Sequence, residues 1–229
     1  MSIYFLLLLI MAVLLYGGII SSLTYAPKKI KIISGIVFSL MAFRYAALII
    51  LFTIKNQSYL YLLKPLVYAN LLCIPICGIL SVLIFSRNNK IKLKKNLFAC
   101  AMIGIAYFIV IYKSSANIDI SNNYGYTMEL QLEFYCYIVL LIINSIFFIK
   151  GIKLYNKIYA NKLGALLIMI ASSITLLSVV ITSINSNFPM ILLGDIAWIA
   201  TIDYGLTTFQ KEVSHFYKWG SHVTTKRKL

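Results

Sequence analysis

The chain alternates runs of about 20 apolar residues with short polar segments. A run of this length crosses the hydrocarbon core of a bilayer as one helix. Only 12% of the residues are charged, against roughly 25% in soluble domains, so a soluble globule is excluded. We predict an all-α polytopic membrane protein with seven transmembrane helices. The apolar runs are residues 3–24, 32–54, 65–86, 96–113, 131–150, 162–185 and 189–209.

The basic residues give the orientation. Of the 21 Lys and Arg residues, 17 lie after the first, third, fifth and seventh runs. Basic residues gather beside spans on the cytoplasmic side. We therefore expect the N-terminus outside and the C-terminus in the cytoplasm, with the chain integral to the plasma membrane. The net charge of +15 then belongs to an inner face that attracts anionic lipid, and we expect no nucleic-acid binding.

Two segments lie outside the apolar runs. Residues 114–130 form the longest outer connection, which is polar and predicts either a flexible connector or a lid over an outward-facing pocket. Residues 210–229 are predicted to be a basic cytoplasmic tail, separate from a seven-helix bundle over residues 1–209. The tail's apolar residues share one helical stripe, which predicts a short amphipathic helix on the inner membrane surface. The stripe consists of Phe209, Val213, Phe216 and Tyr217.

Three charged residues lie within the predicted spans, and each costs roughly 2.5–3.5 kcal/mol near the bilayer centre. They are Arg44, Asp195 and Asp203. The two aspartates are about 12 Å apart along a helix and about 80° apart around it, so they cannot share one proton. Arg44 lies between them in depth, and we favour a pair with Asp203, the deeper acid. Asp195 would then be free to contact water or a ligand, or the charges would simply fix helix register.

Other polar residues could complete a ligand site, and Asn70 and Tyr204 are the candidates named with the charged residues. The four cysteines lie within apolar runs, where small buried residues are the ordinary interpretation. Both histidines lie in the tail, so we expect no metal site and no cofactor. We also expect no enzyme activity, because no Ser/His, Cys/His or metal-binding cluster occurs in the spans.

Seven helices with an outer N-terminus and an amphipathic eighth segment resemble receptor-type bundles and the seven-span sensor regions of bacterial signalling proteins. The resemblance is one of architecture over the whole chain. The charged residues within the spans and the outer connection lead us to expect a stand-alone sensor or regulatory module, which binds a small ligand and passes the signal to a protein partner at its inner loops or tail.

Two alternatives remain open. One is a small-solute or proton-coupled transporter with a three-plus-one-plus-three helix layout, since Pro65 and Pro189 begin the third and seventh runs. The other is a non-catalytic subunit of a larger membrane complex.

Overall fold

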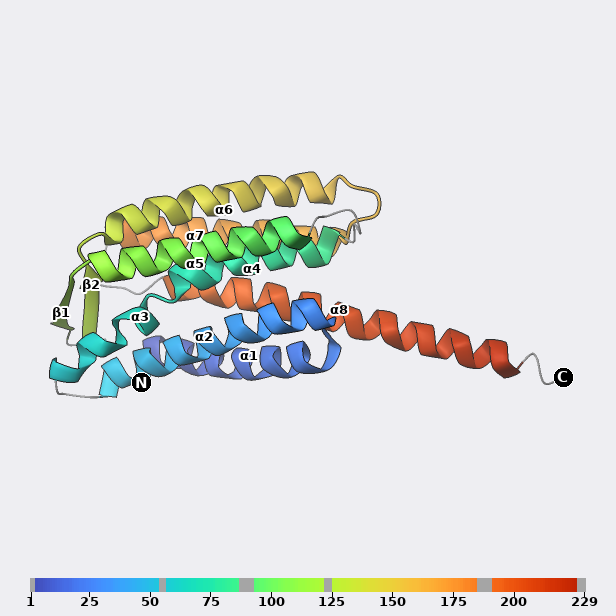
Figure 1. The fold of residues 1–229 in the computed structure, drawn as a ribbon, viewed down its shortest axis with the longest axis horizontal. Coiled ribbons are helices and arrows are strands. Elements are labelled where there is room, and N and C mark those ends of the chain that lie inside the picture. Colours follow the sequence, from blue (N-terminus) through green and yellow to red (C-terminus); the bar gives the residue numbers. More distant parts are fainter. Residues whose placement is uncertain (1–2, 54–56, 87–92, 122–124, 185–190, 226–229) are drawn as a thin grey trace.

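The computed structural model of the chain describes residues 3–53, 57–86, 93–121, 125–184 and 191–225. Its long helices lie side by side, with the N-terminal end and a β-hairpin at one end of the bundle and the C-terminal end far beyond the other (Figure 1). The elements are α1 (Ile3–Tyr25), α2 (Lys28–Thr53), the 3-10 helix η1 (Gln57–Leu63), α3 (Lys64–Val67), α4 (Asn70–Ser86), α5 (Leu93–Lys113), β1 (Ala116–Ser121), β2 (Gly125–Leu130), α6 (Glu133–Tyr155), α7 (Lys162–Ile184) and α8 (Ile191–Thr225).

Six helical segments among the described residues are long and apolar enough to cross a membrane. They correspond to the first six predicted runs, so the chain has the helices of a multi-pass membrane protein, as predicted. The seventh predicted run forms the first part of α8, a helix in the same bundle that carries Asp195 and Asp203 and is not one of the six. The six segments are Tyr4–Tyr25, Lys28–Thr53, Leu60–Ser86, Asn96–Lys113, Glu133–Tyr155 and Lys162–Ile184.

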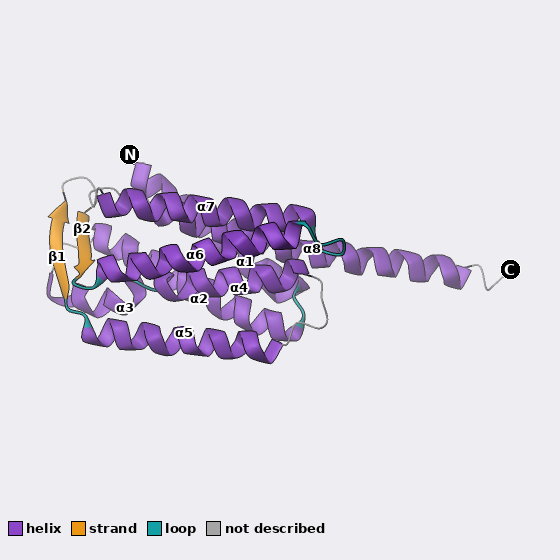
Figure 2. Cartoon of the chain, turned by 90° about the horizontal axis from the view of Figure 1, so that it is seen from above, coloured by secondary structure: helices purple, strands orange, loops and turns teal. Residues whose placement is uncertain are grey.

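Helix α4 is the centre of the bundle and contacts α2, α5, α6, α7 and α8. Most of its side chains are buried. Small residues allow the close approach, because helices in a membrane associate through tight van der Waals packing rather than through exclusion of water. Gly78 of α4 lies directly against the ring of Phe147 in α6. By contrast, α5 lies at the edge of the bundle (Figure 2) and leaves a largely apolar surface exposed.

A buried polar contact fixes α8 against α6. Trp198 Nε1 donates a hydrogen bond to Asn144 Oδ1 at 3.1 Å, and Asn144 Nδ2 donates to the carbonyl of Leu140 at 2.9 Å. The ring of Phe147 meets Trp198 edge-on, with centroids 5.5 Å apart. Trp198 and Asn144 are fully buried, so this cluster fills the middle of the bundle.

The Asn144→Leu variant should lower the free energy of unfolding by about 1–3 kcal/mol. It leaves the Trp198 N–H buried without an acceptor, and the desolvation of that donor is then uncompensated. Equilibrium unfolding in detergent micelles measures the change. The double variant Asn144→Leu/Trp198→Phe removes donor and acceptor together and should recover part of the loss; a double variant less stable than the sum of both singles would contradict this account.

The third predicted span is broken, which the sequence did not predict. The expected helix over 65–86 is divided into α3 and α4 by a turn at Tyr68 and Ala69. Tyr68 has φ −94° and ψ 13°, outside the helical range, and ends α3. The turn leaves carbonyl groups of α3 without partners in the helix, and other helices must satisfy them.

The connection at 114–130 is a β-hairpin rather than an irregular connector. Its strands pair antiparallel, from Ala116 opposite Leu130 to Ser121 opposite Gly125. In β2, Met128 and Leu130 are buried while Glu129 between them is exposed, which is the alternation of a half-buried strand. The Tyr68 hydroxyl donates to the Met128 carbonyl, so the hairpin is attached to the broken third span.

The predicted division into a bundle and a tail stays a prediction, but one helix crosses its boundary. Helix α8 runs without interruption from Ile191 to Thr225, so residues 210–225 continue it instead of forming a separate helix. Figure 1 shows this part projecting from the bundle along the line of α8 and not lying across its end. The side chains of the predicted amphipathic stripe, and residues 226–229, lie outside what the structure describes.

Candidate functional site

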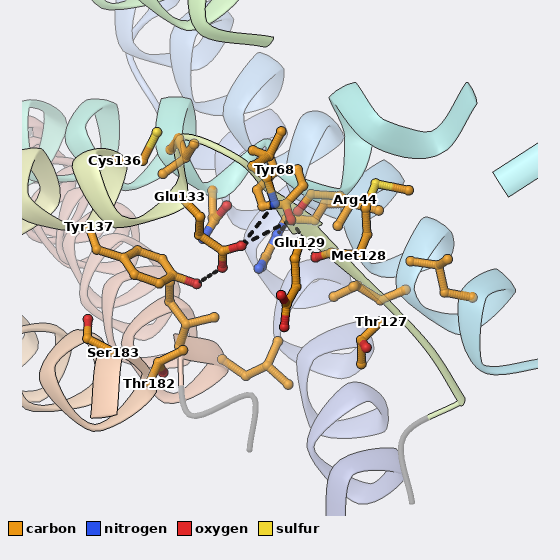
Figure 3. A pocket seen from close by; sticks show the side chains of 18 of the residues that line it. Arg44, Tyr68, Thr127, Met128, Glu129, Glu133, Cys136, Tyr137, Thr182 and Ser183 are labelled. Carbon is orange, nitrogen blue, oxygen red and sulfur yellow. Dashed lines mark hydrogen bonds between the residues drawn. The ribbon is translucent and has the colours of Figure 1, made fainter. Parts of the chain in front are cut away.

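A cavity of about 350 Å³ lies at the hairpin end of the bundle. It forms where the broken third span, the hairpin and the ends of several helices meet, and its walls combine tyrosines, carboxyl groups and apolar side chains (Figure 3). The wall includes Tyr4 of α1, Arg44 of α2, Asn70 of α4, Met128 of β2, Glu133 of α6, Thr182 of α7 and Leu192 of α8. Side chains that are far apart in the sequence therefore converge on one space.

Arg44 lies in this wall and is held by a buried ion pair. Its Nη1 contacts Asp195 Oδ2, and the two side chains are 4% and 0% exposed. The hydroxyl of Tyr45 donates to the same carboxylate oxygen at 2.9 Å and accepts from Arg44 Nη1 at 3.3 Å. Two donors therefore stabilise the Asp195 carboxylate, and its negative charge compensates the positive charge of Arg44.

The break in the third span supplies a further partner for Arg44. Because the chain turns at Tyr68, the carbonyl of Val67 is free to accept a hydrogen bond from outside its own helix. Arg44 Nε donates to it at 2.9 Å. Likewise the Tyr107 hydroxyl of α5 donates to the carbonyl of Pro65. The arginine thus joins α2, the end of α3 and α8 at one point, and the break costs little because its carbonyls are satisfied.

The favoured partner of Arg44 was wrong: the pair forms with Asp195 and not with Asp203. Burial explains the choice. Asp195 is fully buried and needs a counter-charge, whereas Asp203 is only partly buried. Asp203 Oδ1 has no hydrogen-bond partner among the described residues, and the side chain does not line the cavity. The two aspartates therefore differ in their surroundings: Asp195 is paired with Arg44, and Asp203 neither pairs with it nor lines the cavity.

Of the two other candidates, the structure brings one to the cavity. Asn70, the first residue of α4, lines the wall and is 3% exposed, with no hydrogen-bond partner for its Oδ1 in the described part of the chain. Tyr204 does not line the cavity; its ring stacks near Phe85, with centroids 6.1 Å apart.

Glu133, the first residue of α6, also lies in the cavity wall. Its Oε1 accepts a hydrogen bond from the Tyr137 hydroxyl, and its Oε2 accepts one from the Leu130 N–H at 3.1 Å. The Tyr68 hydroxyl lies 3.5 Å from Oε2. Figure 3 shows Glu133 between Tyr137 on one side and Tyr68 on the other. The Tyr137 hydroxyl and the Leu130 N–H both donate to Glu133, as suits an ionised carboxylate, whereas the Tyr68 hydroxyl gives its one hydrogen to the Met128 carbonyl.

Neither Glu133 nor Glu129 is among the site candidates that the sequence indicates. One signal was available: Glu133 and Tyr137 are four residues apart, so on a helix their side chains are neighbours. The contributions of Met128 and Tyr126 depend on the hairpin, which no motif indicated.

The comparisons with known proteins give no name to this site. No protein-family profile matches the chain, and no curated protein matches it. The conclusions on function therefore rest on the geometry of the cavity and its walls.

Proposed function

We propose that the chain is a seven-helix sensor or receptor-like module of the plasma membrane. It binds a small ligand in the cavity at the hairpin end. The main support is the cavity itself, which has a partly apolar wall and a few polar groups, among them Arg44. Ligand pockets are typically concave and largely apolar, with a few placed polar groups. The hairpin end is the lysine-poor end of the bundle, so the ligand would enter from outside.

The packing of α8 supports counting it as the seventh span. It contacts α1, α4 and α7, and Asp195 is fully enclosed by protein. A charged residue in a membrane helix is tolerated when it faces the bundle interior and is paired. Seven spans place the two termini on opposite sides, and Figure 1 shows the described chain ends at opposite ends of the bundle.

The ion pair links the cavity to the segment that would carry a signal. Arg44 touches the cavity on one side and Asp195 of α8 on the other. Because α8 is continuous to Thr225, a rotation or shift at Asp195 is transmitted along one helix to its projecting end, where a protein partner would receive it. The tail and the inner loops are basic, which also suits attraction to anionic lipid.

The interior beyond the cavity favours a binding module over a transporter. Trp198, Ile199 and Ile202 of α8 are fully buried below the level of Asp195. A transport pathway would have to open this packed layer, whereas a sensor needs only to change the position of α8. No enzymatic step is proposed.

Cys136 provides a test of both the cavity and the orientation, because it lines the cavity and is only partly buried. In cells that express a variant with the other three cysteines changed to alanine, a membrane-impermeant methanethiosulfonate reagent added outside should label Cys136. Mass spectrometry of the purified protein measures the labelling. The additional change Cys136→Ala is the control and should abolish it.

Two results would count against the proposal. Labelling that requires permeabilised cells would reverse the orientation. Absence of labelling under both conditions would show that the cavity is closed to water, and the proposed ligand site would be lost.

A further inference from the structure

We propose that the cavity selects a small organic cation with N–H donors, of the class of primary ammonium ions. This inference rests on the proposed ligand-binding function and names the chemistry of the ligand. It is carried by the charge of the cavity, by the unsatisfied acceptor of Asn70 and by the aromatic side chains of the wall.

The charges around the cavity leave a negative surplus. Among the described residues of the wall, Arg44 is the cation, and its charge is compensated by the ion pair with Asp195. Glu129 and Glu133 also line the cavity, and the hydrogen bonds that Glu133 accepts come from uncharged hydroxyl and N–H groups. Two carboxylates thus face a small space without a basic partner there, and a positive charge placed between them would be stabilised.

The wall holds an unsatisfied acceptor. Asn70 Oδ1 lines the cavity, is buried and lacks a donor among the described residues. Buried acceptors without partners are uncommon, and a bound donor is one way to satisfy them. A primary ammonium group brings three N–H donors and no acceptor. It therefore supplies what the wall lacks.

The orientation of Arg44 argues against an anionic ligand. Its Nε is engaged by the Val67 carbonyl and its Nη1 by Asp195 and Tyr45. An anion would have to compete with a buried counter-charge that is already in place, and it would meet repulsion from Glu133. A cation requires no rearrangement of the pair.

Aromatic rings complete the wall. An ammonium ion near the face of a tyrosine or phenylalanine ring is attracted by the ring quadrupole, with an attraction that grows when water is excluded. The volume of about 350 Å³ is at the low end for ligand pockets, which limits the ligand to a small molecule. The aromatic residues of the wall are Tyr4, Tyr68, Tyr126, Phe134 and Tyr137.

Three probes of similar size and different charge test the proposal: benzylammonium, benzyl alcohol and benzoate at neutral pH. Binding to the purified full-length protein in nanodiscs is measured by calorimetry, and thermal unfolding is measured in parallel. Benzylammonium should bind and raise the unfolding temperature, whereas benzyl alcohol and benzoate should bind at least about tenfold more weakly, the factor expected for loss of one partly desolvated charge interaction.

Two variants place the selectivity in the cavity. Glu133→Gln keeps the side-chain shape and should weaken benzylammonium binding by about tenfold or more. Asp119→Asn is the control, because it removes one carboxylate charge from an exposed position on the neighbouring hairpin that does not line the cavity. Its affinity should equal that of the wild type. If Glu133→Gln does not fold, Glu129→Gln at an exposed position should still weaken binding by about threefold.

The outcomes separate this inference from the proposed function. Stronger binding of benzoate or benzyl alcohol, equal loss in Glu133→Gln and Asp119→Asn, or no binding of benzylammonium would overturn the cation preference. If Cys136 is nevertheless labelled from outside, the water-filled ligand cavity stands and only its chemical class was misassigned. If Cys136 is not labelled, both proposals fail together.

Discussion

The Asp195→Asn variant should lower the free energy of unfolding by about 3–5 kcal/mol, the usual cost of leaving one member of a buried ion pair without its partner. Arg44 is 3% exposed and would retain a positive charge with no counter-charge in contact. Asparagine has nearly the shape of aspartate, so the loss reports charge and not packing. Unfolding in micelles followed by tryptophan fluorescence measures it, since Trp198 lies fully buried three residues along the same helix.

Asp203→Asn is the matched control on the same helix. Asp203 is only partly buried, and its Oδ1 has no hydrogen-bond partner among the described residues, so the neutral amide should change stability by less than about 1 kcal/mol. A larger loss for Asp203→Asn than for Asp195→Asn would contradict the structure and would restore the pair with Asp203 that the sequence favoured.

A double variant separates the charge from the scaffold. Arg44→Met with Asp195→Leu removes both charges, and a buried ion pair replaced by apolar groups is often no less stable. We expect it to be more stable than Asp195→Asn alone. Recovery should be incomplete, because the Val67 carbonyl loses the donor that Arg44 Nε provides.

The helices of this bundle could be predicted from the sequence because the lipid bilayer places the same requirement on every span. Each segment must be apolar over about 20 residues and must satisfy its own backbone, so length and composition are sufficient. The first six predicted runs therefore agree with the described helices to within a few residues at most ends. The seven-span count and the orientation still rest on the pattern of basic residues.

The break at Tyr68 and the hairpin follow from tertiary contacts that no local pattern reveals. Pro65 is compatible with a continuous helix and with a broken one. The break is stabilised by Arg44 and Tyr107, from two other helices, which donate hydrogen bonds to the carbonyls of Val67 and Pro65. The hairpin likewise depends on Met128 and Leu130 packing against the bundle. Short strands of this kind are decided by what they are buried against.

The site was predictable in part. Charges inside spans are rare and mark functional or structural pairs, so Arg44 and Asp195 could be singled out. The partner of Arg44 could not be chosen, because depth along a helix says nothing of the direction a side chain faces in the packed bundle. Glu133 is the first residue of α6. Acidic residues are common at helix N-termini because they interact favourably with the helix dipole, so the sequence alone does not mark Glu133 as a cavity residue.

The Gly78→Val variant should lower the free energy of unfolding by about 3 kcal/mol, at the upper end of the cost of overpacking a core. A Cβ atom at this position overlaps the ring of Phe147. The ring cannot simply turn away, because it is 4% exposed and packs edge-on against Trp198. Helices α4 and α6 would have to separate, which also loosens the contact between Asn144 and Trp198.

Gly104→Val provides the comparison that isolates the contact. Gly104 lies in α5, and an added Cβ meets no atom within 4 Å. Both variants change helix propensity equally, so their difference in unfolding free energy in micelles reports the overlap with Phe147 alone. Adding Phe147→Ala should cost less stability in Gly78→Val than in Gly104→Val, because in Gly78→Val it also removes the overlap. Equal losses in the two glycine variants would mean that α4 and α6 do not approach as closely as the fold requires, and the cavity wall that both helices form would then lose its support.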